Sequence, residues 1–177
     1  MSKNERIAIL CIGNILMLDE GVGPRVAQEL LQNFIFPNEI AILDRGTMGM
    51  GLLAEFKHYD TILVVDAVDN TGEPPGTVVA FAPEDIAPYA TFHSAHDTRF
   101  IDVLEAAALL GYTPHGHCMG VQVENMAPAH YTIGLTPQVD AALPLMVYHI
   151  LTFLAARGVE VIDQKTGAPW DGTTVEL

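Results

Sequence analysis

Short apolar runs alternate with amphipathic stretches along most of the chain. The run at 6–12 shows no alternation of apolar and polar residues, which is typical of a strand buried on both faces. Comparable runs predict further strands at 39–43, 61–65, 77–81 and 117–123. Helical periodicity predicts helices at about 24–34, 50–56, 94–110 and 136–157, the last of them buried.

This alternation predicts an α/β fold, a three-layer sandwich in which a central, mostly parallel five-stranded sheet carries helices on both faces. The segment between the strands at 61–65 and 77–81 is too short for a helical crossover, so the strand at 77–81 is expected to be antiparallel and at an edge. Residues 1–160 are expected to form a single α/β domain. Residues 161–177 lack periodicity and are expected to form a C-terminal tail.

Charge and composition exclude several classes of partner. The 177 residues include 22 acids and 8 bases, a net charge of −14, so neither nucleic acid nor an anionic membrane is an expected partner. The apolar segment Ala141–Ala156 is interrupted by Pro144 and His149 and is too short to span a bilayer. The first residues contain too short an apolar region for a signal peptide. Cys11 and Cys118 form no Cys-x-x-Cys pair and are expected to be buried apolar residues, so we expect a cytoplasmic protein.

Two adjacent carboxylates, Asp19 and Glu20, stand in the loop between the first strand and the first helix. This loop matches neither glycine-rich phosphate-binding pattern, and its acids would repel a phosphate and attract a cation. Acids at a helix start also complement the helix dipole, so the pair alone leaves both interpretations open. Asp66 directly follows the apolar run at 61–65. If the strand order is flavodoxin-like, the two strands are neighbours at the switch point of the sheet, and Glu20 and Asp66 converge on one crevice.

A histidine is the third candidate for this crevice. His96, with His93 nearby, lies at the start of the predicted helix at 94–110. Two carboxylates and a neutral imidazole suit a divalent transition metal better than Ca²⁺ or Mg²⁺, which prefer oxygen ligands only. His115 and His117 share one face of a strand, but no carboxylate is close to them in sequence, so they are weaker candidates.

Several segments together resemble the hydrogenase maturation endopeptidases, which trim the C-terminus of the large subunit of nickel–iron hydrogenases. The segments are GNILMLDEGVG (13–23), DRGTMG (44–49), VVDAVD (64–69), SAHD (94–97), GVQVEN (120–125) and LTPQV (135–139). They follow one another in order through most of the chain. The resemblance implies that Glu20, Asp66 and His96 are the metal-binding and catalytic residues.

The resemblance also implies a nickel-dependent endopeptidase that removes the C-terminal extension of a hydrogenase large-subunit precursor. Nickel would arrive with the precursor, although another divalent metal could occupy the site in the isolated protein. The metal would polarise the scissile carbonyl or a bound water, or a carboxylate would act as general base while the metal positions the chain. Asp19 is a candidate helper. Arg45 stands where the family usually has glycine, and we expect it to point to solvent rather than to contact the terminal carboxylate of the substrate.

Three other functions remain open at this point. A non-catalytic nickel chaperone could use the same three ligands. A receiver-like phosphoacceptor domain shares the topology but needs a lysine after the fifth strand, and none stands there. A flavin or nucleotide binder of this architecture is disfavoured by the acidic first loop.

Overall fold

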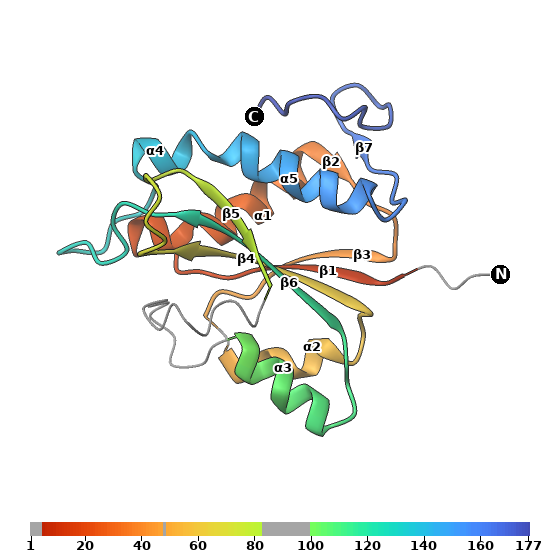
Figure 1. Ribbon diagram of the computed structural model, residues 1–177. Coiled ribbons are helices and arrows are strands. Elements are labelled where there is room, and N and C mark those ends of the chain that lie inside the picture. Colours follow the sequence, from red (N-terminus) through yellow and green to blue (C-terminus); the bar gives the residue numbers. More distant parts are fainter. Residues whose placement is uncertain (1–4, 48, 83–99) are drawn as a thin grey trace.

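A five-stranded sheet forms the centre of the molecule, with the strands in the order β3-β1-β4-β6-β5 (Figure 1). The computed structural model describes residues 5–47, 49–82 and 100–177. The strands of this sheet are β1 (Ile7–Cys11), β3 (Ile40–Asp44), β4 (Thr61–Val68), β5 (Val78–Phe81) and β6 (His115–Gln122). All neighbours pair in parallel except β5, which runs antiparallel to β6 at the edge. The predicted sheet and its antiparallel edge strand are confirmed.

Helices cover both faces of the sheet (Figure 1). One layer contains α1 (Val22–Asn33), the short α4 (Pro137–Asp140) and α5 (Leu143–Ala155); the other contains α2 (Leu53–Phe56) and α3 (Phe100–Leu109). Alternate residues of β1 enter two separate cores: Ile7 and Ile9 pack on the side of α1 and α5, while Ala8 and Leu10 pack on the side of α2 and α3. This is the expected three-layer sandwich, and it explains why β1 is apolar at every position.

The strand order brings β1 and β4 together in the middle of the sheet. The connection from β1 to β3 passes through α1, and the connection from β3 to β4 passes through α2 on the opposite face. The carboxyl ends of β1 and β4 therefore flank the switch point, where α/β sheets bind their ligands. The flavodoxin-like neighbourhood expected from the sequence is present.

Two predicted boundaries were wrong. β4 does not end at Val65 but continues to Val68, because its ladder with β6 continues through Asp66, Ala67 and Val68 after its ladder with β1 has ended. The predicted helix at 136–157 is divided into α4 and α5. Pro144 lies in the first turn of α5. Proline has no backbone N–H to donate and disfavours helical backbone angles at the residue before it, so one continuous helix through this position is unfavourable.

The predicted burial of this helical segment is confirmed, although the segment consists of two helices. Pro137–Ala155 is the one stretch of the described residues that is long and apolar enough to cross a membrane by length and composition alone. Its side chains instead fill the core against the sheet, with Met146, Ile150 and Leu154 fully buried. The helix is therefore explained as a core element of this fold.

The segment after residue 160 packs back onto the domain. Its short strand β7 (Ile162–Asp163) pairs antiparallel with β2 (Phe34–Ile35), which directly follows α1. Trp170 and Val175 lie against the core on the side of α1 and α5. Short-range periodicity could not predict this strand because its partner is more than a hundred residues away in the sequence.

Candidate active site

The loop after β1 is folded tightly against the end of that strand. Gly13 has φ +149°, and a Cβ there would lie 2.0 Å from the carbonyl oxygen of Glu20. A Cβ on Gly23 would lie 2.0 Å from the carbonyl oxygen of Ile12. Asn14 N–H donates to the Glu20 carbonyl at 3.1 Å, which closes the loop. Only glycine permits both close approaches, and together they hold Glu20 beside the end of β1.

Glu20 and Asp66 lie close enough for their charges to interact. Glu20 is buried in the 3₁₀ helix η1 (Leu18–Gly21) before α1. Asp66 is partly buried and follows Val65 in β4. Val65 is the last residue of β4 that pairs with the β1 side, and its carbonyl accepts a hydrogen bond from Ile12 N–H at 2.9 Å. Asp66 therefore stands where the two strands separate, which is the crevice that the topology predicted.

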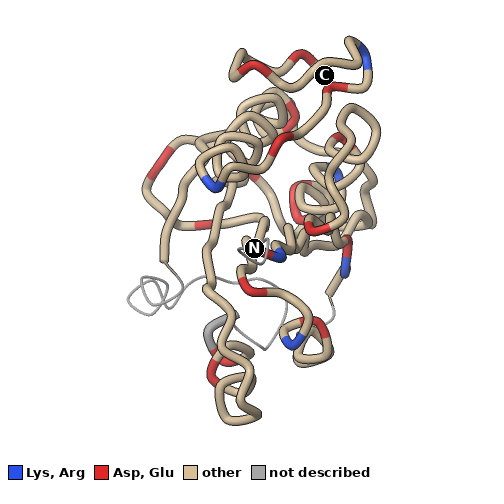
Figure 2. Tube along the Cα trace, turned by 90° about the vertical axis from the view of Figure 1, so that its right-hand side faces the viewer, with Lys and Arg blue, Asp and Glu red and all other residues tan. Residues whose placement is uncertain are grey.

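Burial raises the pKa of Asp66 to about 7, and the nearby Glu20 carboxylate contributes to the rise. The Ala67 N–H donates to Asp66 Oδ1 at 2.8 Å, and this hydrogen bond lowers the pKa of Asp66. Two carboxylates in a poorly hydrated site are a costly arrangement, which a cation would relieve. Acidic residues also recur along the whole trace while basic ones are few, so the surrounding field favours a cation (Figure 2).

The third predicted residue, His96, lies outside the described residues, as does His93. Within 5–47, 49–82 and 100–177, no group of three or more His, Cys, Asp or Glu side chains could hold a metal ion. The described part of the candidate site thus consists of Glu20 and Asp66, and the catalytic and metal-binding roles of Glu20, Asp66 and His96 stay predictions.

Asp19 holds two loops together. It is fully buried, and its carboxylate accepts bonds from the backbone N–H groups of Glu124 (3.1 Å), Asn125 (2.9 Å) and Thr136 (2.7 Å) and from the Thr136 hydroxyl (3.0 Å). These donors occupy both carboxylate oxygens. Asp19 therefore anchors the segment 124–136 under the first loop, a role that explains its presence without a part in the chemistry.

Arg45 does not point freely to solvent, so that expectation was wrong. Its Nη2 and Nε lie 2.7 and 3.0 Å from Glu55 Oε1, and its side chain is 30% exposed. Glu55 lies in α2, so the ion pair holds the Arg45 guanidinium against this helix. This pairing also argues against Arg45 as a receptor for the substrate's terminal carboxylate, since its charge is already compensated.

The remaining histidines and cysteines considered from the sequence are not part of the crevice at Glu20 and Asp66: the histidines lie at the other end of the sheet, and the cysteines are buried. His115 and His117 lie at the amino end of β6, opposite the start of β4, and so at the far end of the sheet from Asp66. Burial and the nearby Arg157 lower the pKa of His117. Cys11 and Cys118 are both buried, as predicted. Burial and the nearby carboxylates raise the pKa of the Cys11 thiol, which makes it a poor nucleophile.

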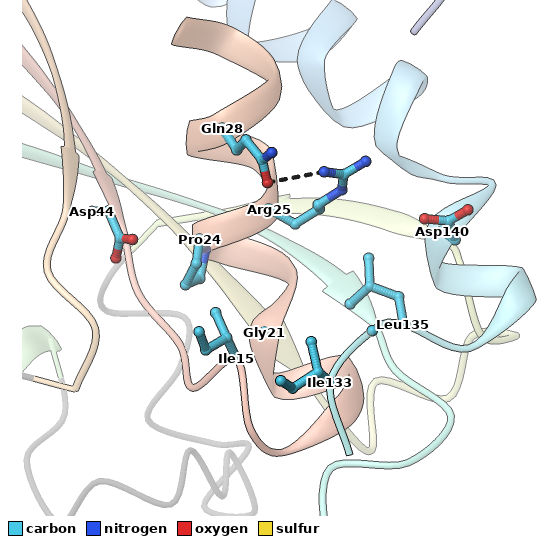
Figure 3. Close-up of a pocket in the computed structure, with 10 residues that line it drawn as sticks. Ile15, Gly21, Pro24, Arg25, Gln28, Asp44, Ile133, Leu135 and Asp140 are labelled. Atoms are coloured by element: carbon cyan, nitrogen blue, oxygen red, sulfur yellow. Dashed lines mark hydrogen bonds between the residues drawn. The ribbon is translucent and has the colours of Figure 1, made fainter. Parts of the chain in front are cut away.

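Sequence reasoning missed a groove beside this crevice (Figure 3). The groove has a volume of about 550 Å³ and lies between the first loop, α1 and the segment that leads into α4. Its lining consists of Ile15, Gly21, Pro24, Arg25, Gln28, Asp44, Ile133, Gly134, Leu135 and Asp140. The available signal was the apolar Ile15-Leu16 pair in the middle of a loop, where such residues have no core to enter.

Comparison with known proteins gives a consistent picture. The family model described as hydrogenase maturation protease matches residues 24–153. The hydrogenase 2 maturation protease of Escherichia coli K12 is 35% identical over 162 residues, which are 90% of this chain and 97% of that protein. The hydrogenase expression/formation protein HupD of Rhodobacter capsulatus is 34% identical over 170 residues, 93% of this chain and 78% of that protein.

Solved structures agree with the sequence comparison. The hydrogenase maturating endopeptidase HybD from E. coli superposes with a TM-score of 0.82 at 35% identity, over 91% of this chain and 99% of that one. The sequence resemblance is thereby confirmed, and a receiver domain or flavin binder is excluded. The chain belongs to the hydrogenase maturation protease family and is an endopeptidase.

Proposed function

We propose that this endopeptidase acts on the nickel-loaded precursor of a nickel–iron hydrogenase large subunit and removes its C-terminal extension in the cytoplasm. The nickel belongs to the substrate and is recognised by Glu20, Asp66 and His96. Recognition of the metal would make cleavage conditional on nickel insertion, because the free enzyme offers only part of a coordination shell.

The observation that supports this proposal most is the interaction between Glu20 and Asp66. A protein does not gain stability by placing two carboxylates beside each other where burial raises the pKa of one of them to about 7. An incoming divalent cation reverses that cost, since it stabilises both ionised carboxylates. Perturbed carboxylates at a switch point are typical of functional sites.

The same geometry suits either chemical route. Nickel held by the carboxylates could polarise the scissile carbonyl or a water. A carboxylate whose pKa is near neutral could instead take a proton from the attacking water. Both routes require Asp66 to be ionised before the step. Binding of the cation would lower the pKa of Asp66, which favours coordination but makes the carboxylate a weaker general base, so the two routes differ in the basicity that they require of it.

Intact-mass spectrometry of a cognate large-subunit precursor tests the proposal. The nickel-loaded precursor is incubated with the protein, and a nickel-free precursor serves as the matched control. A discrete C-terminal loss only in the nickel-loaded sample is the expected result. Equal cleavage of both samples would contradict nickel recognition. Transfer of nickel to or from the protein with no change in precursor mass would indicate a nickel chaperone instead.

A further inference from the structure

Four large apolar side chains are exposed beside the active-site crevice. They are Ile15 (54% exposed), Leu16 (40%), Tyr131 (81%) and Ile133 (76%). We name these four residues the lip. They come from two loops more than a hundred residues apart in sequence, which nevertheless meet in one place. Clustered exposed apolar residues on a small protein commonly mark an interaction site.

The two loops of the lip are joined by their backbones. Leu18 N–H donates to the Thr132 carbonyl at 2.8 Å, and Thr132 N–H donates to the Leu16 carbonyl at 2.8 Å. Met17 and Thr132 form an isolated parallel bridge between the loops. Buried Asp19 lies beneath and holds the same second loop through four further bonds. The backbone of the lip is thus already ordered. Binding of a partner to its exposed side chains would therefore cost little conformational entropy.

The lip is continuous with the active site. Ile15 and Ile133 of the lip also line the groove, where Figure 3 shows Ile133 near Leu135 and Ile15 below Pro24. Gly21, another lining residue, directly follows Glu20. The groove is therefore within reach of a polypeptide whose scissile bond lies at Glu20 and Asp66.

The charges of the groove restrict what it binds. Among the described residues that line it, the one arginine is Arg25, which Glu29 holds at 2.7 Å and Gln28 at 2.9 Å, so its charge is compensated. The exposed carboxylates of Asp44 and Asp140 lie on opposite sides of it (Figure 3). An acidic segment would be repelled from this surface, whereas a segment with an apolar side chain next to a lysine or arginine would be complementary.

We propose that the lip and the adjoining groove dock the large-subunit precursor itself, through a segment that carries apolar and basic side chains. This inference rests on the proposed function, because it assigns a binding surface for that substrate. The lip would contribute to substrate affinity, and Glu20 and Asp66 to the reaction. The two contributions can therefore be separated kinetically.

The test is the cleavage kinetics of Ile15→Ser, Ile133→Ser and wild-type protein on a nickel-loaded precursor. Removal of an interface anchor should raise the KM about tenfold per residue, while kcat stays within about twofold. Ile35→Ser is the matched control, because Ile35 is also 54% exposed but lies on β2, away from the crevice. It should leave both constants unchanged. A further variant, Asp140→Asn, should raise the KM and weaken its dependence on salt.

The outcomes distinguish the two proposals. If the wild-type protein does not cleave the precursor, the proposed function fails. If it cleaves and the lip variants show the wild-type KM, the docking surface is refuted while the function stands. A fall in kcat alone would also refute it. Sedimentation of the same variants gives an independent check, because a wild-type dimer that the lip variants abolish would assign the surface to self-association and overturn the proposal.

Discussion

Substitution of Asp66 by asparagine should stabilise the protein in a pH-dependent manner. The ordinary pKa of this carboxyl is 3.8, and in the folded protein it is raised to about 7. Between these values the unfolded chain is ionised at Asp66 whereas the folded protein holds a proton there. The folded state thus binds more protons, so Asp66 lowers the stability progressively as the pH rises through this interval. An asparagine side chain at this position cannot ionise and avoids that cost.

The size of the effect follows from the interval. One pKa unit corresponds to about 1.4 kcal/mol, so the free energy of unfolding of the variant, relative to wild type, should increase by up to about 1.4 kcal/mol per pH unit. The full interval gives an upper bound of about 4 kcal/mol above pH 7. Asp66 is only partly buried, and water screens part of the cost, so we expect about 1–3 kcal/mol between pH 5 and pH 8. The Ala67 N–H can still donate to the asparagine oxygen.

Urea unfolding at a series of pH values, with a chelator present, measures this difference. The chelator is necessary because a bound cation would lower the pKa of Asp66 and hide the effect. Asp69→Asn, the same chemical change three residues further along, is the control. The reasoning would be refuted if the difference between Asp66→Asn and wild type stayed constant with pH, or if it decreased as the pH rose.

Three further predictions concern the same loops. Glu20→Gln removes the like charge near Asp66 and should lower the pKa of Asp66, which carboxyl-detected NMR would show as a titration at lower pH; an unmoved titration would contradict the interaction. Asp19→Asn places an amide NH₂ against backbone donors, so hydrogen bonds to a buried charged acceptor are lost. The free energy of unfolding, measured in urea, should fall by about 2–4 kcal/mol. A change below about 0.5 kcal/mol would show that the anchor is unimportant. Gly23→Ala places a Cβ 2.0 Å from a backbone oxygen and should lower the thermal midpoint by at least about 5 °C. Gly172→Ala has open space around it but a φ of +85°, and should lower the midpoint by less. Equal midpoints for these two variants would refute the packing argument.

The sequence was sufficient to predict the strand topology and, from it, where Glu20 and Asp66 lie, although not their roles. Unbroken apolar runs predicted a sheet buried on both faces, and the switch-point rule then placed Glu20 and Asp66 at one crevice. The extra length of β4 could not be predicted, because it depends on continued pairing with β6 and not on its own residues.

Side-chain partners distant in the sequence were also beyond prediction. Arg45 meets Glu55 only because the turn after β3 leads into α2. Asp19 meets Thr136 across 117 positions, so an acid that suggested helix-dipole or catalytic roles is an anchor between loops. The lip was missed for the same reason, since its two halves come together through contacts between loops more than a hundred residues apart, the Leu18–Thr132 and Thr132–Leu16 backbone bonds and the Asp19 anchor.

The central claim is that Glu20 and Asp66 bind the nickel of the substrate. X-ray absorption at the nickel edge tests it directly, with the loaded precursor measured alone and then freeze-quenched with the protein before cleavage. We predict that mixing adds oxygen ligands to the nickel, and that Glu20→Gln and Asp66→Asn each reduce this change. A nickel spectrum that is unchanged by mixing, in a sample that proceeds to cleavage on thawing, would contradict the claim.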